Sequence, residues 1–117
     1  MCHVLIIEDD WIIAEHIAIL VKSAGAISID LAATEDDAVE QALRRQPAVI
    51  VSDVALAAGL GPAAVSRIVA EYGPTPVMFV TGEPRTSHPT FLGSPVIDKP
   101  FEDQLLIATF KSIAPVA

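Results

Sequence analysis

Residues 48–53 read AVIVSD, an apolar run that ends in the carboxylate of Asp53 at the mouth of a loop, residues 54–61. The run is unbroken rather than alternating, which is typical of a strand covered on both faces within a parallel sheet. A single aspartate after a strand is commonly a turn residue. Asp53 is a stronger candidate because other predicted strands also end in charged or hydroxyl groups, and we take it as the candidate chemical centre.

The composition indicates one folded domain. The chain has 117 residues, of which 52% are hydrophobic, and its 15 acidic and 7 basic residues give a formal charge of −8. That charge disfavours binding to nucleic acid or to anionic membranes. No apolar run could span a bilayer, the N-terminus does not read as a signal peptide, and the single cysteine, Cys2, suits a reducing compartment. We therefore expect one cytoplasmic domain over residues 1–117, without an output domain.

Apolar segments and helical periodicities alternate along the chain. Strands are predicted at residues 3–7, 26–32, 48–52, 76–80 and 96–97. Helices are predicted at residues 11–24, 34–46, 62–73 and 101–113. Asp10 is placed to cap the first helix, and the second is expected to bury Ala38, Val39, Ala42 and Leu43. Strands joined by crossover helices predict an α/β fold, a doubly wound five-stranded parallel sheet.

The alternation breaks between the fourth and fifth strands. Pro84, Pro89, Gly93 and Pro95 crowd this segment, residues 83–95. Proline removes backbone donors and restricts the residue before it, so no regular helix of useful length fits. We expect a loop there, or at most one turn, in place of a fourth crossover helix.

The ends of the predicted strands carry the chemistry. The first strand is followed by Glu8 and Asp9, the third by Asp53, the fourth by Thr81, and the fifth by Lys99. The second strand is followed by nothing charged. A strand order of 2-1-3-4-5 places the four strands that end in charged or hydroxyl groups side by side. It leaves the second strand at an edge of the sheet. In such sheets, ligands bind beyond the carboxyl ends of the strands.

This set of groups suits phosphoryl transfer. Three carboxylates in one crevice repel each other unless a cation neutralises them, and oxygen ligands suit Mg²⁺. Lys99 adds a positive charge and Thr81 a hydroxyl. A carboxylate beside Mg²⁺, lysine and threonine is equipped to accept a phosphoryl group.

The chain resembles the CheY-like receiver domains of two-component response regulators over nearly its whole length. The matching segments are residues 4–9 (VLIIED), 49–53 (VIVSD), 77–82 (VMFVTG) and 98–101 (DKPF). The resemblance implies a flavodoxin-like fold and Mg²⁺ as cofactor, with Asp53 as phosphoacceptor and Thr81 and Lys99 on the phosphoryl group. It implies metal ligands in four residues: Glu8, Asp9, Asp53 and the backbone carbonyl of Ala55. It also implies a cis peptide bond between Lys99 and Pro100.

Some positions depart from the family pattern. Val96 stands where many receivers carry an aromatic residue that rotates when the threonine hydroxyl moves, and Ala57 stands where many carry proline. The proline-rich segment also replaces a helix of the family's usual output face. Residues 53–59 (DVALAAG) and 89–92 (PTFL) resemble a narrower group, the atypical receivers of alphaproteobacterial general stress signalling.

The resemblance implies a stand-alone receiver that accepts a phosphoryl group from a histidine kinase or histidine phosphotransfer protein. It would catalyse only its own phosphorylation and dephosphorylation and would signal through a downstream protein partner. One alternative is a pseudo-receiver that binds partners without phosphorylation. Another is a small Mg²⁺-dependent phosphohydrolase, although such enzymes commonly carry a second acid where this chain has Ala55.

The first and last helices carry more apolar residues than one buried face needs. Ile12 and Ile19 lie off the main stripe of the first helix. Six apolar residues surround much of the last: Phe101, Leu105, Leu106, Ile107, Phe110 and Ile113. They could be ordinary exposed residues or a surface for a protein partner or a homodimer, and the sequence leaves both open.

Overall fold

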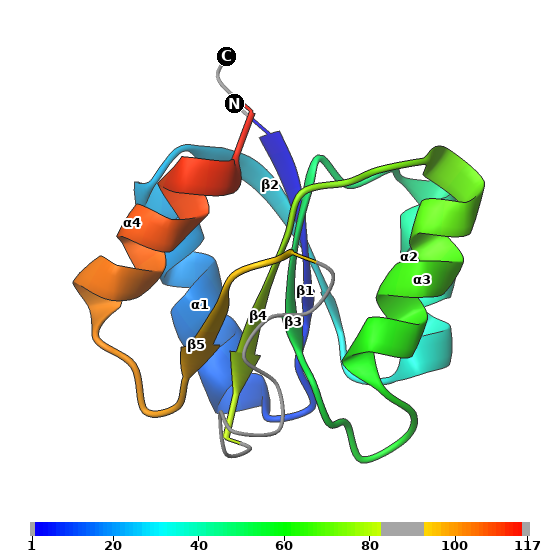
Figure 1. The fold of residues 1–117 in the computed structure, drawn as a ribbon, viewed down its shortest axis with the longest axis horizontal. Coiled ribbons are helices and arrows are strands. Elements are labelled where there is room, and N and C mark those ends of the chain that lie inside the picture. The colour runs from blue at the N-terminus through cyan, green and yellow to red at the C-terminus, as the bar shows by residue number, and fades with distance from the viewer. Residues whose placement is uncertain (1, 83–92, 116–117) are drawn as a thin grey trace.

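The computed structural model describes residues 2–82 and 93–115, and its strands form one parallel sheet (Figure 1). In chain order the elements are β1 (Cys2–Ile7), α1 (Trp11–Ser23), β2 (Ala26–Ala32), α2 (Glu35–Arg44), β3 (Val49–Asp53), α3 (Gly61–Tyr72), β4 (Val77–Thr81), β5 (Val96–Asp98) and α4 (Asp103–Ile113). The sheet order is β2-β1-β3-β4-β5, which confirms the predicted topology.

The register of the sheet brings the functional strand ends to one edge. Ile7 pairs with Ser52, Asp53 with Val80, and Thr81 with Asp98. Because all strands run parallel, the residues that follow β1, β3, β4 and β5 meet at the lower edge of the sheet in Figure 1.

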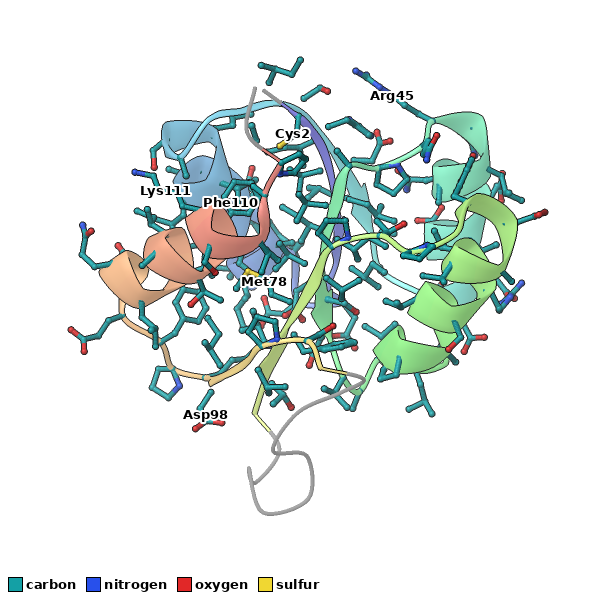
Figure 2. The ribbon with its side chains drawn as sticks, turned by 45° about the horizontal axis from the view of Figure 1, so that its top comes forward. Cys2, Arg45, Met78, Asp98, Phe110 and Lys111 are labelled. Carbon is teal, nitrogen blue, oxygen red and sulfur yellow. The ribbon has the colours of Figure 1, made fainter. Side chains whose placement is uncertain are left out.

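Two helical layers cover the sheet. Helices α1 and α4 lie on one face, and α2 and α3 lie on the other (Figure 1). Successive strand residues point to opposite faces, so Val4 and Ile6 belong to one core cluster while Leu5 and Ile7 belong to the other. Figure 2 shows the two faces filled with side chains, with Phe110 of α4 in the same cluster as the strands beneath it.

The predicted helix start is correct for α1, one residue early for α2 and too early for α4. Asp10 caps α1 by accepting from the backbone N–H groups of Ile12 and Ile13, at 3.0 and 3.3 Å. The last helix begins at Asp103 instead of residue 101. Phe101 instead packs toward α1, with its ring stacked on His16, so its apolar character reflects tertiary packing and not the helix period.

One predicted core position is wrong. Ala38, Val39 and Ala42 are buried, whereas the side chain of Leu43 is 52% exposed. A helix turns about 100° per residue, so Leu43 points about 100° away from Ala42. It therefore lies outside the narrow buried face that Ala38, Val39 and Ala42 form.

The proline-rich segment, residues 83–95, is described only from Gly93 onward, where the backbone is not helical. The rest of that predicted loop lies outside the described residues. Among the helices that the structure describes, none is long and apolar enough to cross a membrane.

Candidate functional site

Three carboxylates meet at the carboxyl edge of the sheet. Carboxylate oxygens of Glu8, Asp9 and Asp53 all lie within 4.8 Å of one another. Glu8 and Asp53 are buried, at 4% and 8% exposure, while Asp9 is exposed. Within residues 2–82 and 93–115, this is the group of acidic side chains close enough to hold a metal ion.

Hydrogen bonds hold both the backbone and the side chain of Glu8. Its backbone N–H donates to the carbonyl of Ala32 at 2.9 Å, and its Oε2 accepts from the backbone N–H of Asp10 at 3.1 Å. Burial raises the pKa of Glu8 above its usual value, although the hydrogen bond from Lys99 acts in the opposite direction. A nearby cation favours the ionised form of such a buried carboxyl group.

Lys99 supplies part of that positive charge. Its Nζ lies 2.6 Å from Glu8 Oε1 and 3.1 Å from Asp53 Oδ2. Burial acts to lower the pKa of Lys99, but the hydrogen bonds to Glu8 and Asp53 outweigh it and the pKa is raised. The ammonium therefore stays protonated. One ammonium against three carboxylates leaves a net negative site, which suits a divalent cation.

The backbone around Asp53 is held closely. Asp53 Oδ1 accepts from the N–H of Val54 at 2.8 Å, and Ser52 Oγ donates to the Asp53 carbonyl at 2.8 Å. Gly61 lies against that carbonyl so closely that a Cβ there would collide with it. Ser52 and Gly61 are positioning residues that were not predicted from the sequence. The only indication in the sequence is that Gly61 directly precedes Pro62. The close approach of Gly61 to the Asp53 carbonyl depends on tertiary packing, which the sequence does not show.

The remaining predicted residues lie at the same edge. Thr81 is buried at the end of β4, and its carbonyl accepts from the N–H of Lys99 at 2.8 Å. Ala55 lies in the loop after β3, where it forms an isolated bridge with Leu60. The Lys99–Pro100 peptide bond is cis, as predicted.

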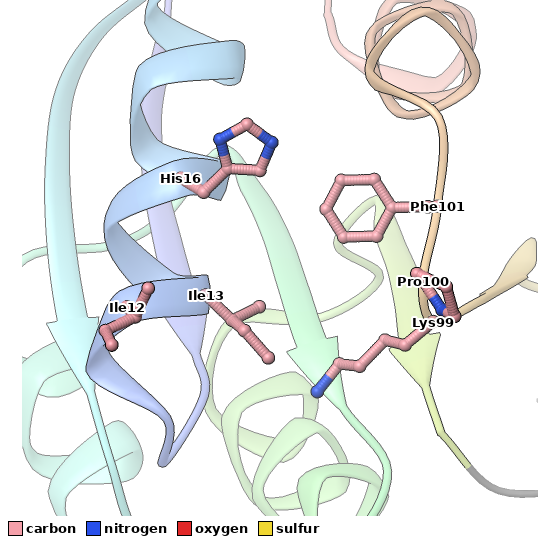
Figure 3. A pocket seen from close by; sticks show the side chains of 6 residues that line it. All are labelled: Ile12, Ile13, His16, Lys99, Pro100 and Phe101. Atoms are coloured by element: carbon pink, nitrogen blue, oxygen red, sulfur yellow. The ribbon is translucent and has the colours of Figure 1, made fainter.

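An apolar cavity of about 430 Å³ opens beside this site (Figure 3). Six residues line it: Ile12, Ile13, His16, Lys99, Pro100 and Phe101. The rings of His16 and Phe101 stack with centroids 5.9 Å apart, and His16 Nε2 lies 2.8 Å from Asp103 Oδ1. Lys99 thus belongs both to the cavity wall and to the acid cluster.

The donor set fits magnesium. All three candidate side chains offer carboxylate oxygens, which a small hard cation prefers, and the site has no histidine or cysteine among them. Asp9 and the neighbouring loop are exposed, which leaves room for the water ligands that Mg²⁺ usually keeps.

Comparisons with known proteins agree with this geometry. The sequence profile of the response regulator receiver domain matches residues 4–111. No significant match exists among curated proteins.

Solved structures similar to this chain include a receiver domain and longer response regulators. The receiver (REC) domain of the response regulator PhyR from Erythrobacter litoralis is 28% identical, with a TM-score of 0.83 over 99% of this chain and 95% of that one. PhyR from Brucella abortus is also 28% identical, with a TM-score of 0.82 over 97% of this chain. This chain spans 47% of that PhyR, about half its length.

A more distant structure shares the fold. The chemotaxis protein CheY4 of Vibrio cholerae is 24% identical, with a TM-score of 0.83 over 97% of this chain and 98% of that one. The profile match covers most of the chain, and the acid cluster and lysine lie where the motif residues predicted them. The chain belongs to the response regulator receiver domain family.

Proposed function

We propose that residues 1–117 act as one receiver domain in which Asp53 accepts a phosphoryl group from a phosphohistidine. The donor is a histidine kinase or a histidine phosphotransfer protein. The observation that carries this proposal is the bridge that Lys99 Nζ makes between Glu8 and Asp53, inside a cluster of three carboxylates within 4.8 Å. A lone turn aspartate would need neither the half-buried Lys99 nor the two acidic neighbours.

In the transfer, an Asp53 carboxylate oxygen bonds to phosphorus as the bond from phosphorus to the donor's imidazole nitrogen breaks. The electron pair of the broken bond stays on that nitrogen, which takes up a proton. The product on Asp53 is an acyl phosphate. Magnesium held by Glu8, Asp9, Asp53 and the Ala55 carbonyl supplies charge neutralisation to the phosphoryl oxygens when it is bound.

The surrounding side chains orient and stabilise the group that arrives. Lys99 Nζ, now 3.1 Å from Asp53 Oδ2, turns from that oxygen to a phosphoryl oxygen. The Thr81 hydroxyl, at the end of the neighbouring strand, donates to another. The donor's histidine must reach Asp53, so the donor protein covers the surrounding surface, where Trp11 and Ile12 are 69% and 64% exposed.

The output of the domain is a protein–protein contact that phosphorylation changes. The new charge on Asp53 shifts the loop after β3 between two arrangements. Val96 is buried in β5 and has no ring to rotate, so the signal is not read through an aromatic residue at that position. Similarity to PhyR, which is named as a stress response regulator, supports a role in stress signalling.

Intact mass spectrometry tests the proposal. Wild type, Asp53→Ala and Asp98→Ala are incubated with a small phosphodonor and Mg²⁺. Asp98 is the matched control, because it is an exposed acid at the same edge of the sheet and outside the cluster. We expect one added phosphate on wild type and on Asp98→Ala and none on Asp53→Ala.

Other results would replace the proposal with one of its alternatives. Continuous turnover of added phosphoesters would identify a phosphohydrolase. Wild type that takes up no phosphate from the small donor or from a cognate kinase would identify a pseudo-receiver. Circular dichroism of each variant checks that the substitution leaves the fold intact.

A further inference from the structure

The loop between β3 and α3, residues 54–60, contacts the acid cluster at Asp53, where the loop begins, and again at Asp9. The backbone N–H of Ala57 donates to Asp9 Oδ2 at 2.6 Å. Ala55, whose carbonyl is the expected fourth protein ligand, lies two residues earlier in the same loop and is bridged to Leu60. The positions of Asp9 and Ala55 therefore depend on where this loop is held.

The loop has a second attachment, on the side of α2, and one residue provides it. Glu35 Oε1 accepts from the N–H of Leu60 at 3.1 Å, and the Glu35 N–H donates to the carbonyl of Ala58 at 3.1 Å. Gly59 lies between these two contacts with φ +92°, and a Cβ there would collide with the Glu35 side chain. Side chain and backbone of Glu35 thus hold three consecutive loop residues.

Arg67 of α3 keeps the Glu35 carboxylate in this position. Its Nη1 donates to Glu35 Oε2 at 3.0 Å and to Asp36 Oδ1 at 2.8 Å. The hydrogen bonds with Asp36 and Glu35 raise the pKa of Arg67. The Glu35 side chain is 23% exposed and that of Asp36 is 91% exposed, so only the first is enclosed by the loop.

The ordinary role of an acid at this position does not account for these contacts. Glu35, Asp36 and Asp37 form the first turn of α2, where negative charge is favourable to the helix dipole. That role needs a carboxylate near the helix end but no particular partner. Both oxygens of Glu35 are instead used by groups outside α2, one on the loop and one on α3.

We propose that Glu35 is a positioning residue for the metal site. It holds the loop after β3 so that Ala55 and Asp9 keep the spacing that a magnesium ion requires. The proposal rests on the proposed function only in taking Glu8, Asp9 and Asp53 as the magnesium site. Groups that orient metal ligands typically contribute ~10–100-fold to metal affinity.

Calorimetric titration with MgCl₂ tests this role in the absence of any phosphodonor. Fluorescence of Trp11, the single tryptophan, gives a second readout two residues from Asp9. We expect Glu35→Ala to weaken magnesium binding about tenfold. Glu35→Gln keeps an oxygen that can accept from Leu60 N–H and should retain most of the affinity.

Asp36→Ala is the matched control. It removes a neighbouring acid that pairs with the same arginine and whose side chain is 91% exposed. We expect its magnesium affinity to equal that of wild type. Thermal unfolding without metal, measured for each variant, separates a loss of global stability from a loss at the site.

The outcomes distinguish this inference from the function on which it rests. Wild type that binds no magnesium would overturn the metal site itself. Wild type that binds magnesium, with Glu35→Ala binding as tightly, would overturn the role of Glu35 alone. Equal losses in Glu35→Ala and Asp36→Ala would also overturn it, because they would assign the effect to charge at the helix end.

Discussion

At the scale of single residues, Lys99 sets the electrostatic balance of the acid cluster. Its ammonium contacts both buried carboxylates, and its hydrogen bond opposes the burial that raises the pKa of Glu8. The substitution Lys99→Met removes the ammonium group and leaves the buried carboxylates without their positively charged partner. We expect the free energy of unfolding at neutral pH to fall by ~1–3 kcal/mol.

The pH dependence of this loss follows from the raised pKa of Glu8. A carboxyl group with a higher pKa in the folded state contributes stability fully below its unfolded value, and that contribution disappears as pH rises through the folded value. The penalty for Lys99→Met should therefore be largest at neutral pH and smaller near pH 5. Urea unfolding at both pH values measures it, with the exposed Lys111→Met as control. A penalty that does not shrink on acidification, or an equal one in the control, would contradict the assignment.

The sequence could predict the residues that follow strands but not those that support them. Glu8, Asp9, Asp53 and Lys99 each lie one or two residues after an apolar run, and parallel strands bring such ends together. Glu35 gave no such signal, because its partners lie on a loop 23 or more residues away in the chain. In the sequence it is one of three acids at a helix start, and only tertiary contacts separate it from its neighbours.

At the scale of elements, the loop after β3 combines metal binding with access to Asp53. Ala55 is small and exposed, so it leaves the acyl phosphate open to water. Ala55→Arg should cover it and slow loss of phosphate several-fold, as measured by the decay of the phosphorylated mass after the donor is removed. Ala58→Arg places the same side chain elsewhere in the exposed loop and serves as control. A decay rate unchanged by Ala55→Arg would show that this position does not control access.

Helix boundaries and helix faces were less predictable than the helices themselves. The apolar residues Phe101 and Leu43 each matched the periodicity of the adjacent helix, yet Phe101 precedes α4 and Leu43 faces solvent. Periodicity shows which residues of a segment are apolar. It does not show which part of the fold each apolar side chain packs against. The stacking of Phe101 on His16 joins two segments that are distant in the chain, and no local pattern contains that information.

At the scale of the whole molecule, the fold holds three acids together in a chain whose formal charge is already −8. Repulsion among these acids opposes folding, and a bound divalent cation removes it. A ligand that binds only the folded state stabilises it by about 2.7 kcal/mol at a hundredfold excess over its Kd. We therefore expect Mg²⁺ to raise the free energy of unfolding by about that amount at saturation, and EDTA to reverse the gain. Urea unfolding with MgCl₂, compared with NaCl at equal ionic strength, separates specific binding from screening.

Asp9→Asn should lose the magnesium-dependent gain and be more stable than wild type without metal, because one repelling charge is gone. An equal gain from NaCl, or a magnesium response that survives in Asp9→Asn, would mean that the cluster is not the place where the ion binds.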